Sequence, residues 1–198
     1  SDYQETESLT GLKDLAAMNQ YCYFVAGVVG EMLTELFCDY SEAINRHKPI
    51  LMKLSVSFGQ GLQMTNILKD IWEDRQRGAC WLPQDIFEKH GFNLNNLTPE
   101  TADEKFQAGL AELLGIAKNH LRNALIYTHL IPPNEKGIRR FCLWAIGMAI
   151  LTLNKINQNR DFSEGVQVKI NRRSVKATII ATSLFARYNW ALDALFRF

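Results

Sequence analysis

Three side chains that carry oxygen ligands recur at every fourth position in the run from Gln63 to Pro83. They are Asn66, Asp70 and Asp74, and apolar residues lie between them. On an α-helix, residues four apart lie on nearly the same face, so these side chains form one row along the helix. The spacing therefore favours a helix that carries an acidic row beside an apolar surface.

This row has two interpretations. Acidic residues at helical spacing most often form a solvated face. However, the preceding residues 54–68 are mostly apolar or small, which is typical of a buried helix. Buried charge is costly unless it is paired or binds a metal, and carboxylate and amide oxygens are the ligands that Mg²⁺ prefers. We therefore predict a magnesium site, and its mixed anionic and apolar surroundings suit a lipid diphosphate.

Composition limits the classes of protein to which the chain can belong. With 198 residues, of which 47% are hydrophobic and 22% charged, it can bury a sizeable core without disulfides. The net charge is +1 and the two signs are interspersed, so no nucleic-acid partner is expected. The four cysteines are widely spaced within apolar runs, which indicates reduced core thiols and a cytoplasmic location.

Two apolar segments bear on membrane association. The run Phe141 to Leu153 is shorter than the roughly 20 residues of a membrane span, so we interpret it as a buried helix. The final segment 179–198 mixes aromatic residues with arginines. This composition fits an ordinary packing helix, and the alternative is a peripheral contact with a membrane surface.

Helix signals dominate the first half of the chain, and strand signals are nearly absent. We predict one helix that Thr10 caps and that continues to Phe37, and a second from Pro49 to Gly78. Gly27 and Gly30 lie within the first helix. Because glycine disfavours a helix interior, this pair indicates close approach of another backbone or a ligand.

The second half shows the same kind of signals. Thr98 and Pro99 predict the start of a helix that ends near Leu130. Pro132 and Pro133 then break the chain before a helix over 137–157, and Ser174 is predicted to cap the last helix. Together these signals predict an all-α bundle of five or six helices.

Two long motifs carry a resemblance to a known family. The run 21–30, Tyr-Cys-Tyr-Phe-Val-Ala-Gly-Val-Val-Gly, and the run 63–83 resemble the squalene and phytoene synthases, which are head-to-head prenyl transferases. Within that family, residues 30–37 and 168–170 are most similar to bacterial-type squalene synthases. The resemblance implies an isoprenoid-synthase-type helical bundle. It also implies Mg²⁺-dependent condensation of two farnesyl diphosphates, through a cyclopropyl diphosphate, to squalene with NADPH.

The resemblance also implies roles for residues of the second motif. Asn66, Asp70 and Asp74 would bind Mg²⁺ on the substrate diphosphate. Three further residues would line or orient the same shell and contact the substrate, namely Gln63, Lys69 and Glu73. In this family the metal and cationic side chains assist departure of the diphosphate, while a dry apolar cavity protects the carbocation from water.

Three residues outside that motif match further positions of the family. Tyr21 would be the catalytic tyrosine, which contacts the departing diphosphate or steadies the allylic cation. Lys169 and Arg172 would contact the phosphate of NADPH, although Asn171 occupies the second basic position of that motif. A phytoene or dehydrosqualene synthase, in which the cation loses a proton instead of accepting a hydride, therefore stays an alternative.

The likeness covers only the second half of the family pattern, and no counterpart of its first aspartate-rich motif occurs in the chain. We therefore expect residues 1–198 to be the C-terminal part of a single isoprenoid synthase catalytic domain, lacking its N-terminal helices. Such a fragment would be inactive without the missing N-terminal half of the same enzyme. A further alternative is a catalytically inactive relative that acts as an assembly protein, but such a protein has no physical need to keep the row Asn66, Asp70 and Asp74.

Overall fold

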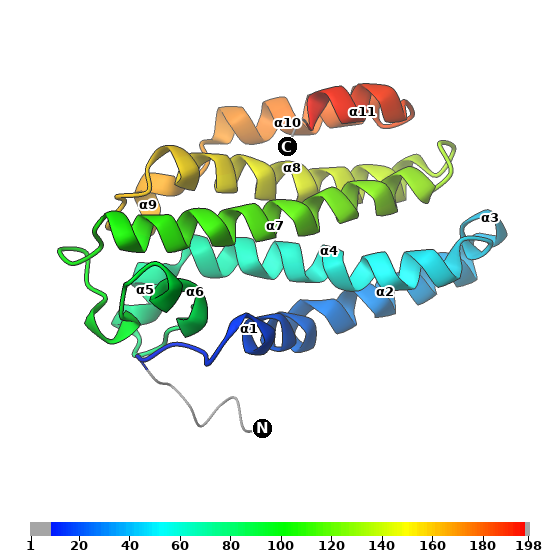
Figure 1. Ribbon diagram of the computed structural model, residues 1–198. Helices are drawn as coiled ribbons and strands as arrows, with labels where there is room; N and C mark the ends of the chain where they lie inside the picture. Colours follow the sequence, from blue (N-terminus) through cyan, green and yellow to red (C-terminus); the bar gives the residue numbers. More distant parts are fainter. Residues whose placement is uncertain (1–8, 197–198) are drawn as a thin grey trace.

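A computed structural model describes residues 9–196, which form helices joined mainly by short loops (Figure 1). The long helices are α2 (Val28–Tyr40), α4 (Lys48–Lys69), α7 (Glu104–Leu130), α8 (Lys136–Gln158) and α10 (Arg172–Phe185). The shorter elements are α1 (Leu15–Cys22), α3 (Glu42–Asn45), α5 (Ile71–Gln76), α6 (Gln84–Lys89), α9 (Gly165–Val168), α11 (Asn189–Leu195), a π-helical turn (Tyr23–Gly27) and a 3₁₀ turn (Leu94–Asn96). No strand occurs between residues 9 and 196, so the predicted all-α class is confirmed.

The long helices run roughly alongside one another, and α4 lies inside the bundle (Figure 1). It packs against α2 on one side and against α7 and α8 on the other, while α10 covers α8. The core consists of apolar side chains from these helices, and their removal from water is the main force that holds them together. Fully buried examples are Leu51, Met64, Leu68, Leu121 and Ile146. The short helices α5, α6 and α9 lie near the end of the bundle where α4 ends and α7 begins.

Two helices begin later than the sequence predicts. The first begins at Leu15, because the Asp14 carboxylate accepts a hydrogen bond from a backbone N–H of the first turn, so the predicted cap at Thr10 is wrong. The helix α7 is capped in the same way by Asp103, and the prediction at Thr98 is wrong, since residues 98–101 form a separate turn. Aspartate is as good a cap as threonine, and a sequence that offers both does not decide between them.

The second half of the bundle follows the predicted breaks. Pro132 and Pro133 lie between α7 and α8, as expected. The last long helix is capped by Asn171, whose side-chain oxygen accepts from the backbone N–H of Ser174 at 2.8 Å. The prediction of Ser174 as the cap is therefore wrong by three residues, and Ser174 lies inside the first turn.

Small residues allow α2 and α4 to cross at very short range. A Cβ atom on Gly30 would lie 2.4 Å from the carbonyl oxygen of Ser55, and one on Gly59 would lie 2.3 Å from that of Ala26. The predicted close approach of another backbone is therefore confirmed at Gly30. At Gly27 the neighbour is instead the ring of Tyr23, within the same helical segment.

We expect Gly59→Ala to lower the free energy of unfolding by about 2 kcal/mol, because the added methyl group meets backbone that cannot move cheaply. Gly115→Ala is the matched control. A Cβ there would meet nothing within 4 Å, and alanine favours an exposed helix, so this change is expected to be stabilising. Urea unfolding followed by circular dichroism measures both variants. Equal shifts in the same direction would contradict this account of the crossing.

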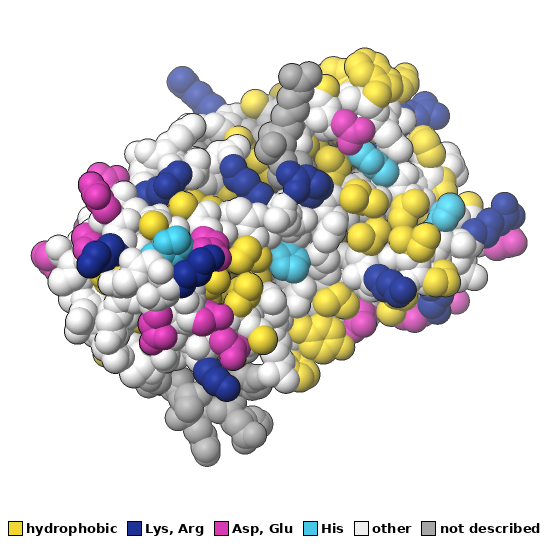
Figure 2. Space-filling model, in the orientation of Figure 1, with side chains coloured by type: hydrophobic (Ala, Val, Ile, Leu, Met, Phe, Trp, Pro, Cys, Tyr) yellow, Lys and Arg dark blue, Asp and Glu magenta, His cyan; other side chains and the backbone are white. Residues whose placement is uncertain are grey.

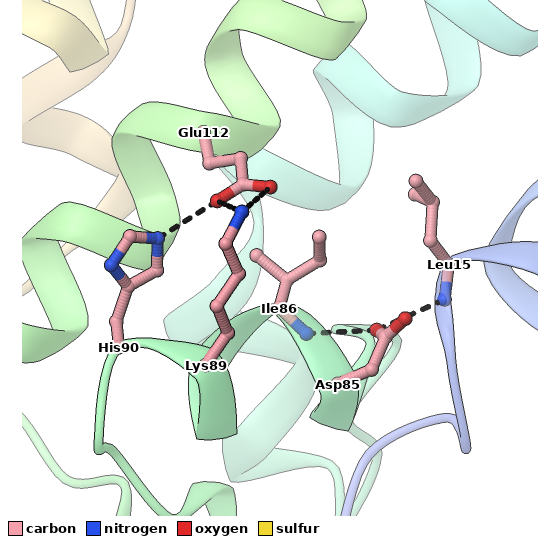
Figure 3. A network of polar contacts seen from close by, with 6 residues as sticks. All are labelled: Leu15, Asp85, Ile86, Lys89, His90 and Glu112. Atoms are coloured by element: carbon pink, nitrogen blue, oxygen red, sulfur yellow. Dashed lines mark hydrogen bonds and ion pairs between the residues drawn. The ribbon is translucent and has the colours of Figure 1, made fainter.

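A network of polar contacts fixes α6 against two other helices (Figure 3). The Asp85 carboxylate accepts from the backbone N–H of Leu15 at 3.1 Å, and so ties α6 to the start of α1. On α7, Glu112 accepts both hydrogen bonds of Lys89 at 2.9 Å, and its Oε2 lies 2.8 Å from Nε2 of His90. The network thereby holds α1, which carries Tyr21, against the segment that follows the second motif.

All four cysteines are free and buried, as the sequence predicts. Burial raises the pKa of the Cys22 thiol to about 12, which makes it a core residue and not a nucleophile. The stretch Leu15–Tyr40, and not the run 141–153, is long and apolar enough to cross a membrane by length and composition. Of the 18-residue window in that stretch that meets this criterion, 22% is buried, and the packed side of the stretch contacts α4.

Candidate active site

The acidic row spans a break between two helices. The predicted helix 49–78 is wrong as one element, because α4 ends at Lys69 and the backbone of Asp70 leaves helical geometry with φ −101° and ψ 16°. The helical hydrogen bonds continue across the break, from Asp70 N to the Asn66 carbonyl at 2.9 Å and from Asp74 N to the Asp70 carbonyl at 2.8 Å. The three side chains therefore remain on successive turns. The predicted end at Gly78 is confirmed by its φ of 84°.

The two aspartates of the row repel each other. The pKa of Asp74 is raised, first by burial and second by the negative charge of Asp70. Lys69 and Arg77 offset part of this charge, with ion pairs to Asp70 at 3.0 Å and to Asp74 at 3.9 Å. A cation between the carboxylates would relieve the repulsion, because it favours the ionised form of both groups.

The donor set fits a magnesium ion that shares its ligands with a substrate. Among residues 9–196, no three acidic, histidine or cysteine side chains come together as a closed metal cage. Mg²⁺ does not need one, since it is commonly bound by one or two carboxylates while water and phosphate oxygens complete its shell. Asp70 and Asp74 can supply the carboxylates, and Asn66 lies exposed one turn before them.

A polar pocket of about 360 Å³ lies beside Asp70, between α5 and the segment around α9. Lys69, Asp70, Glu73 and Lys169 all line it. The Oε2 atom of Glu73 is buried without a hydrogen-bond partner, and a Cβ on Gly165 would lie 2.3 Å from its Oε1. The segment that leads to Lys169 thus rests directly on the Glu73 carboxyl group. Two lysines and three acids, the third being Glu164, therefore surround one pocket.

Tyr21 lies on α1 and is held by an aromatic partner. Its ring stacks on that of Trp81, with 4.2 Å between centroids and 11° between the planes. The pKa of Tyr21 is raised by burial, with smaller contributions from Cys22 and Asp74, so its hydroxyl is protonated at neutral pH. Sequence reasoning missed Trp81, although it lies at the end of the second motif. Pairing an aromatic residue of that motif with Tyr21 would have been the available signal.

A groove extends from the acidic row toward the other end of the bundle. A hollow of about 500 Å³ contains Asn66 and Lys69 at its polar end and continues between α4 and α8. It shares Leu62 and Ala145 with a second, apolar hollow of about 230 Å³. We call the second hollow the apolar groove, and its large side chains include Val25, Val29, Leu33, Phe58, Tyr127 and Phe141.

Four predicted site residues do not line any of the three hollows described above, namely Tyr21, Gln63, Asp74 and Arg172. Asp74 lies one turn after Asp70 in the acidic row, and Tyr21 stacks on Trp81. Gln63 is half-buried on α4 and Arg172 is exposed at the start of α10. Lys169, in contrast, lines both the polar pocket and the hollow beside Asn66. The roles assigned to Gln63, Arg172 and Lys169 stay predictions.

Comparison with known proteins decides the family. The sequence profile described as squalene/phytoene synthase matches residues 2–174. The chain belongs to this family. It is 31% identical over 180 residues to the squalene synthase of Gibberella zeae, which covers 90% of the chain and 37% of that enzyme. It is also 34% identical over 110 residues to the phytoene synthase of Thermus thermophilus, which covers 56% of the chain and 35% of that enzyme.

Solved structures support the fold. A dehydrosqualene synthase in complex with a ligand superimposes with a TM-score of 0.66 at 20% identity, over 95% of this chain and 60% of that one. The isoprenoid-synthase-type helical bundle predicted for this squalene/phytoene synthase chain is therefore confirmed. The chain spans less than two fifths of the Gibberella zeae enzyme's length.

Proposed function

We propose that the full-length protein is a head-to-head prenyl transferase that condenses two farnesyl diphosphates through a cyclopropyl diphosphate to squalene. The observation that carries the proposal is the sequence of linked hollows beside the acidic row. Asp70 lines the polar pocket, which shares Lys69 and Lys169 with the hollow that contains Asn66, and that hollow leads into the apolar groove. The surroundings change from charged beside the acidic row to apolar in the groove, and a ligand with an anionic head and a long apolar tail matches this change. Membership in the squalene/phytoene synthase family supports the same reaction class.

Each group has a task that its position supports. Mg²⁺, when bound, would neutralise charge on the departing diphosphate. Asp70 and Asp74 would hold the metal, while Lys69 and Lys169 lie close enough to the polar pocket to attract phosphate oxygens. The protonated hydroxyl of Tyr21 can donate a hydrogen bond near Asp74. The apolar groove would exclude water from the allylic cation, which water would otherwise quench.

The exposed side of α2 supports completion of the site by further helices. Phe24, Val28, Met32, Leu36 and Tyr40 follow one another at intervals of four residues, and each is 37% exposed or more. An apolar row of this length is unusual on a finished surface. We propose that the N-terminal half of the same enzyme covers it.

We also propose that α11 contacts a membrane surface, because apolar side chains gather over that helix (Figure 2).

The second candidate function is phytoene or dehydrosqualene synthesis. It is favoured by Asn171 at a position where reductive family members carry a basic residue, and by the exposed position of Arg172 away from the polar pocket. Under this alternative, the cation loses a proton and NADPH is not consumed. Lys169 beside the polar pocket favours the reductive reaction.

We expect the full-length enzyme to form squalene from farnesyl diphosphate only when Mg²⁺ and NADPH are both present. Mass spectrometry of the extracted products, with geranylgeranyl diphosphate as a parallel substrate, separates the alternatives. Dehydrosqualene or phytoene formed regardless of NADPH would support the second candidate. Failure to bind any prenyl diphosphate in the presence of Mg²⁺ would support the inactive relative.

A further inference from the structure

The apolar groove has one buried aromatic side chain in its lining that comes from α7. Its walls come from the π-helical turn, α2, α4 and α8, whereas α7 contributes one of the described lining residues, Tyr127. Tyr127 is 3% exposed, so its ring is enclosed by the surrounding helices. Phe58 lies eight residues before Asn66 on α4, which places it about 12 Å along the helix from the acidic row. The Tyr127 ring meets Phe58 edge to face, with 5.7 Å between centroids.

A hydrogen bond fixes the position of Tyr127. The Thr34 hydroxyl donates to the carbonyl of Gly30 at 2.8 Å, which leaves its oxygen to accept from the Tyr127 hydroxyl at 2.9 Å. This pair joins α7 to α2 across the base of the apolar groove. A buried tyrosine that is bonded at one end and packed at the other cannot swing aside without breaking the bond and losing the contact.

We propose that Tyr127 is the floor of the apolar groove and determines the length of the prenyl chain that the enzyme accepts. The inference rests on the proposed function, because it assigns the apolar groove to the tail of a prenyl diphosphate whose head lies at Asp70 and Asp74. The continuity of the two hollows through Leu62 and Ala145 supports this single occupant. A farnesyl tail ends before the ring, whereas the additional isoprene unit of a geranylgeranyl tail meets it.

Enlargement of the floor tests this assignment. In the full-length protein with Mg²⁺, we expect the thiolo analogue of farnesyl diphosphate to bind at least about tenfold more tightly than that of geranylgeranyl diphosphate. We define the ratio as the dissociation constant of the geranylgeranyl analogue divided by that of the farnesyl analogue. In Tyr127→Ala this ratio is expected to fall by about tenfold or more. Titration calorimetry measures both constants without turnover.

Three further variants make the result specific. Ile126→Ala removes an exposed neighbour on α7 and is expected to keep the wild-type ratio. Tyr127→Phe keeps the ring and loses the hydrogen bond, so its ratio should stay within about twofold. Val29→Phe adds bulk to the opposite wall and should weaken the longer analogue more than the shorter one. If Tyr127→Ala loses its cooperative thermal transition, Tyr127→Leu serves in its place.

The outcomes separate the two levels of inference. An unchanged ratio in a folded Tyr127→Ala or Tyr127→Leu overturns the role of Tyr127 and leaves the proposed function intact. If neither analogue binds the wild-type protein with Mg²⁺, the proposed function fails, and the assignment of the floor fails with it. A lowered ratio in Tyr127→Ala, together with the results expected for the control variants, supports both the role of Tyr127 and the proposed function.

Discussion

Asp74→Asn should reduce Mg²⁺-dependent binding of farnesyl diphosphate by more than about 100-fold, and Asp70→Asn should do the same. Removal of an outer partner of a metal ligand already costs 10- to 100-fold, so loss of a ligand itself should cost more. Titration calorimetry of the full-length protein with the thiolo analogue of farnesyl diphosphate, with and without Mg²⁺, gives the affinities. Asp39→Asn, an exposed acid on α2, is the control.

Although Asp74→Asn should weaken ligand binding, it should stabilise the metal-free protein. Because the pKa of Asp74 is raised in the folded state, the native protein binds more protons than the unfolded chain in the range just above the ordinary aspartate pKa. Its stability therefore falls as the pH rises through that range. Asp74→Asn removes the buried charge and should raise the melting temperature at neutral pH. A lower melting temperature together with undiminished binding would contradict the assignment of Asp74 as a ligand.

The acidic row could be predicted from the sequence because it depends on local periodicity alone. The hydrogen bonds from Asp70 N and Asp74 N preserve that periodicity even though the helix breaks at Asp70. The break itself depends on two backbone angles that no residue type in the run specifies, so the predicted helix was too long. Of the glycine pair, Gly30 was informative because it lies where α2 meets the backbone of α4, whereas Gly27 contacts only the Tyr23 ring of its own segment.

The contacts that complete the site join distant parts of the chain, and a single sequence does not show such pairs. Trp81 stacks on Tyr21 from the far end of the second motif, and the carboxyl group of Glu73 supports Gly165. Sequence reasoning therefore predicted the placement of the row on successive turns and missed the residues that position its surroundings.

Arg139 is the clearest residue that sequence reasoning overlooked, because arginines are rarely fully buried. Its side chain is 0% exposed on α8. One Nη atom donates to the carbonyls of Thr128 at 2.9 Å and of Ile131 at 2.6 Å, at the end of α7. The last turn of an α-helix leaves its carbonyls without the usual helical partner, and here the Thr128 carbonyl accepts from the backbone N–H of Ile131 at 3.2 Å as well as from Arg139.

The remaining donors of Arg139 hold the C-terminal helices. Its Nε donates to the carbonyl of Ala186, and its second Nη donates to the side-chain oxygen of Asn189. Ala186 and Asn189 flank the turn between α10 and α11. One guanidinium group thus joins the end of α7 to that turn, and its fixed fork of donors suits several acceptors at once. Burial lowers the pKa of Arg139, which is the cost of enclosing this charge without a carboxylate partner.

Arg139→Leu should therefore lower the free energy of unfolding by roughly 3–5 kcal/mol, because the buried carbonyls of Ile131 and Ala186 lose their arginine donor and those of Thr128 and Asn189 lose one of their contacts. Arg140→Leu is the matched control, since Arg140 is the exposed neighbour on the same helix and should change stability by less than about 0.5 kcal/mol. Urea unfolding gives both values. Limited proteolysis should also cut Arg139→Leu first near the turn at 186–189, whereas Arg139→Lys, which keeps the charge but not the fork, should be intermediate. Equal stability of Arg139→Leu and Arg140→Leu would mean that packing of α10 on α8, and not the guanidinium group, holds the C-terminal helices in place.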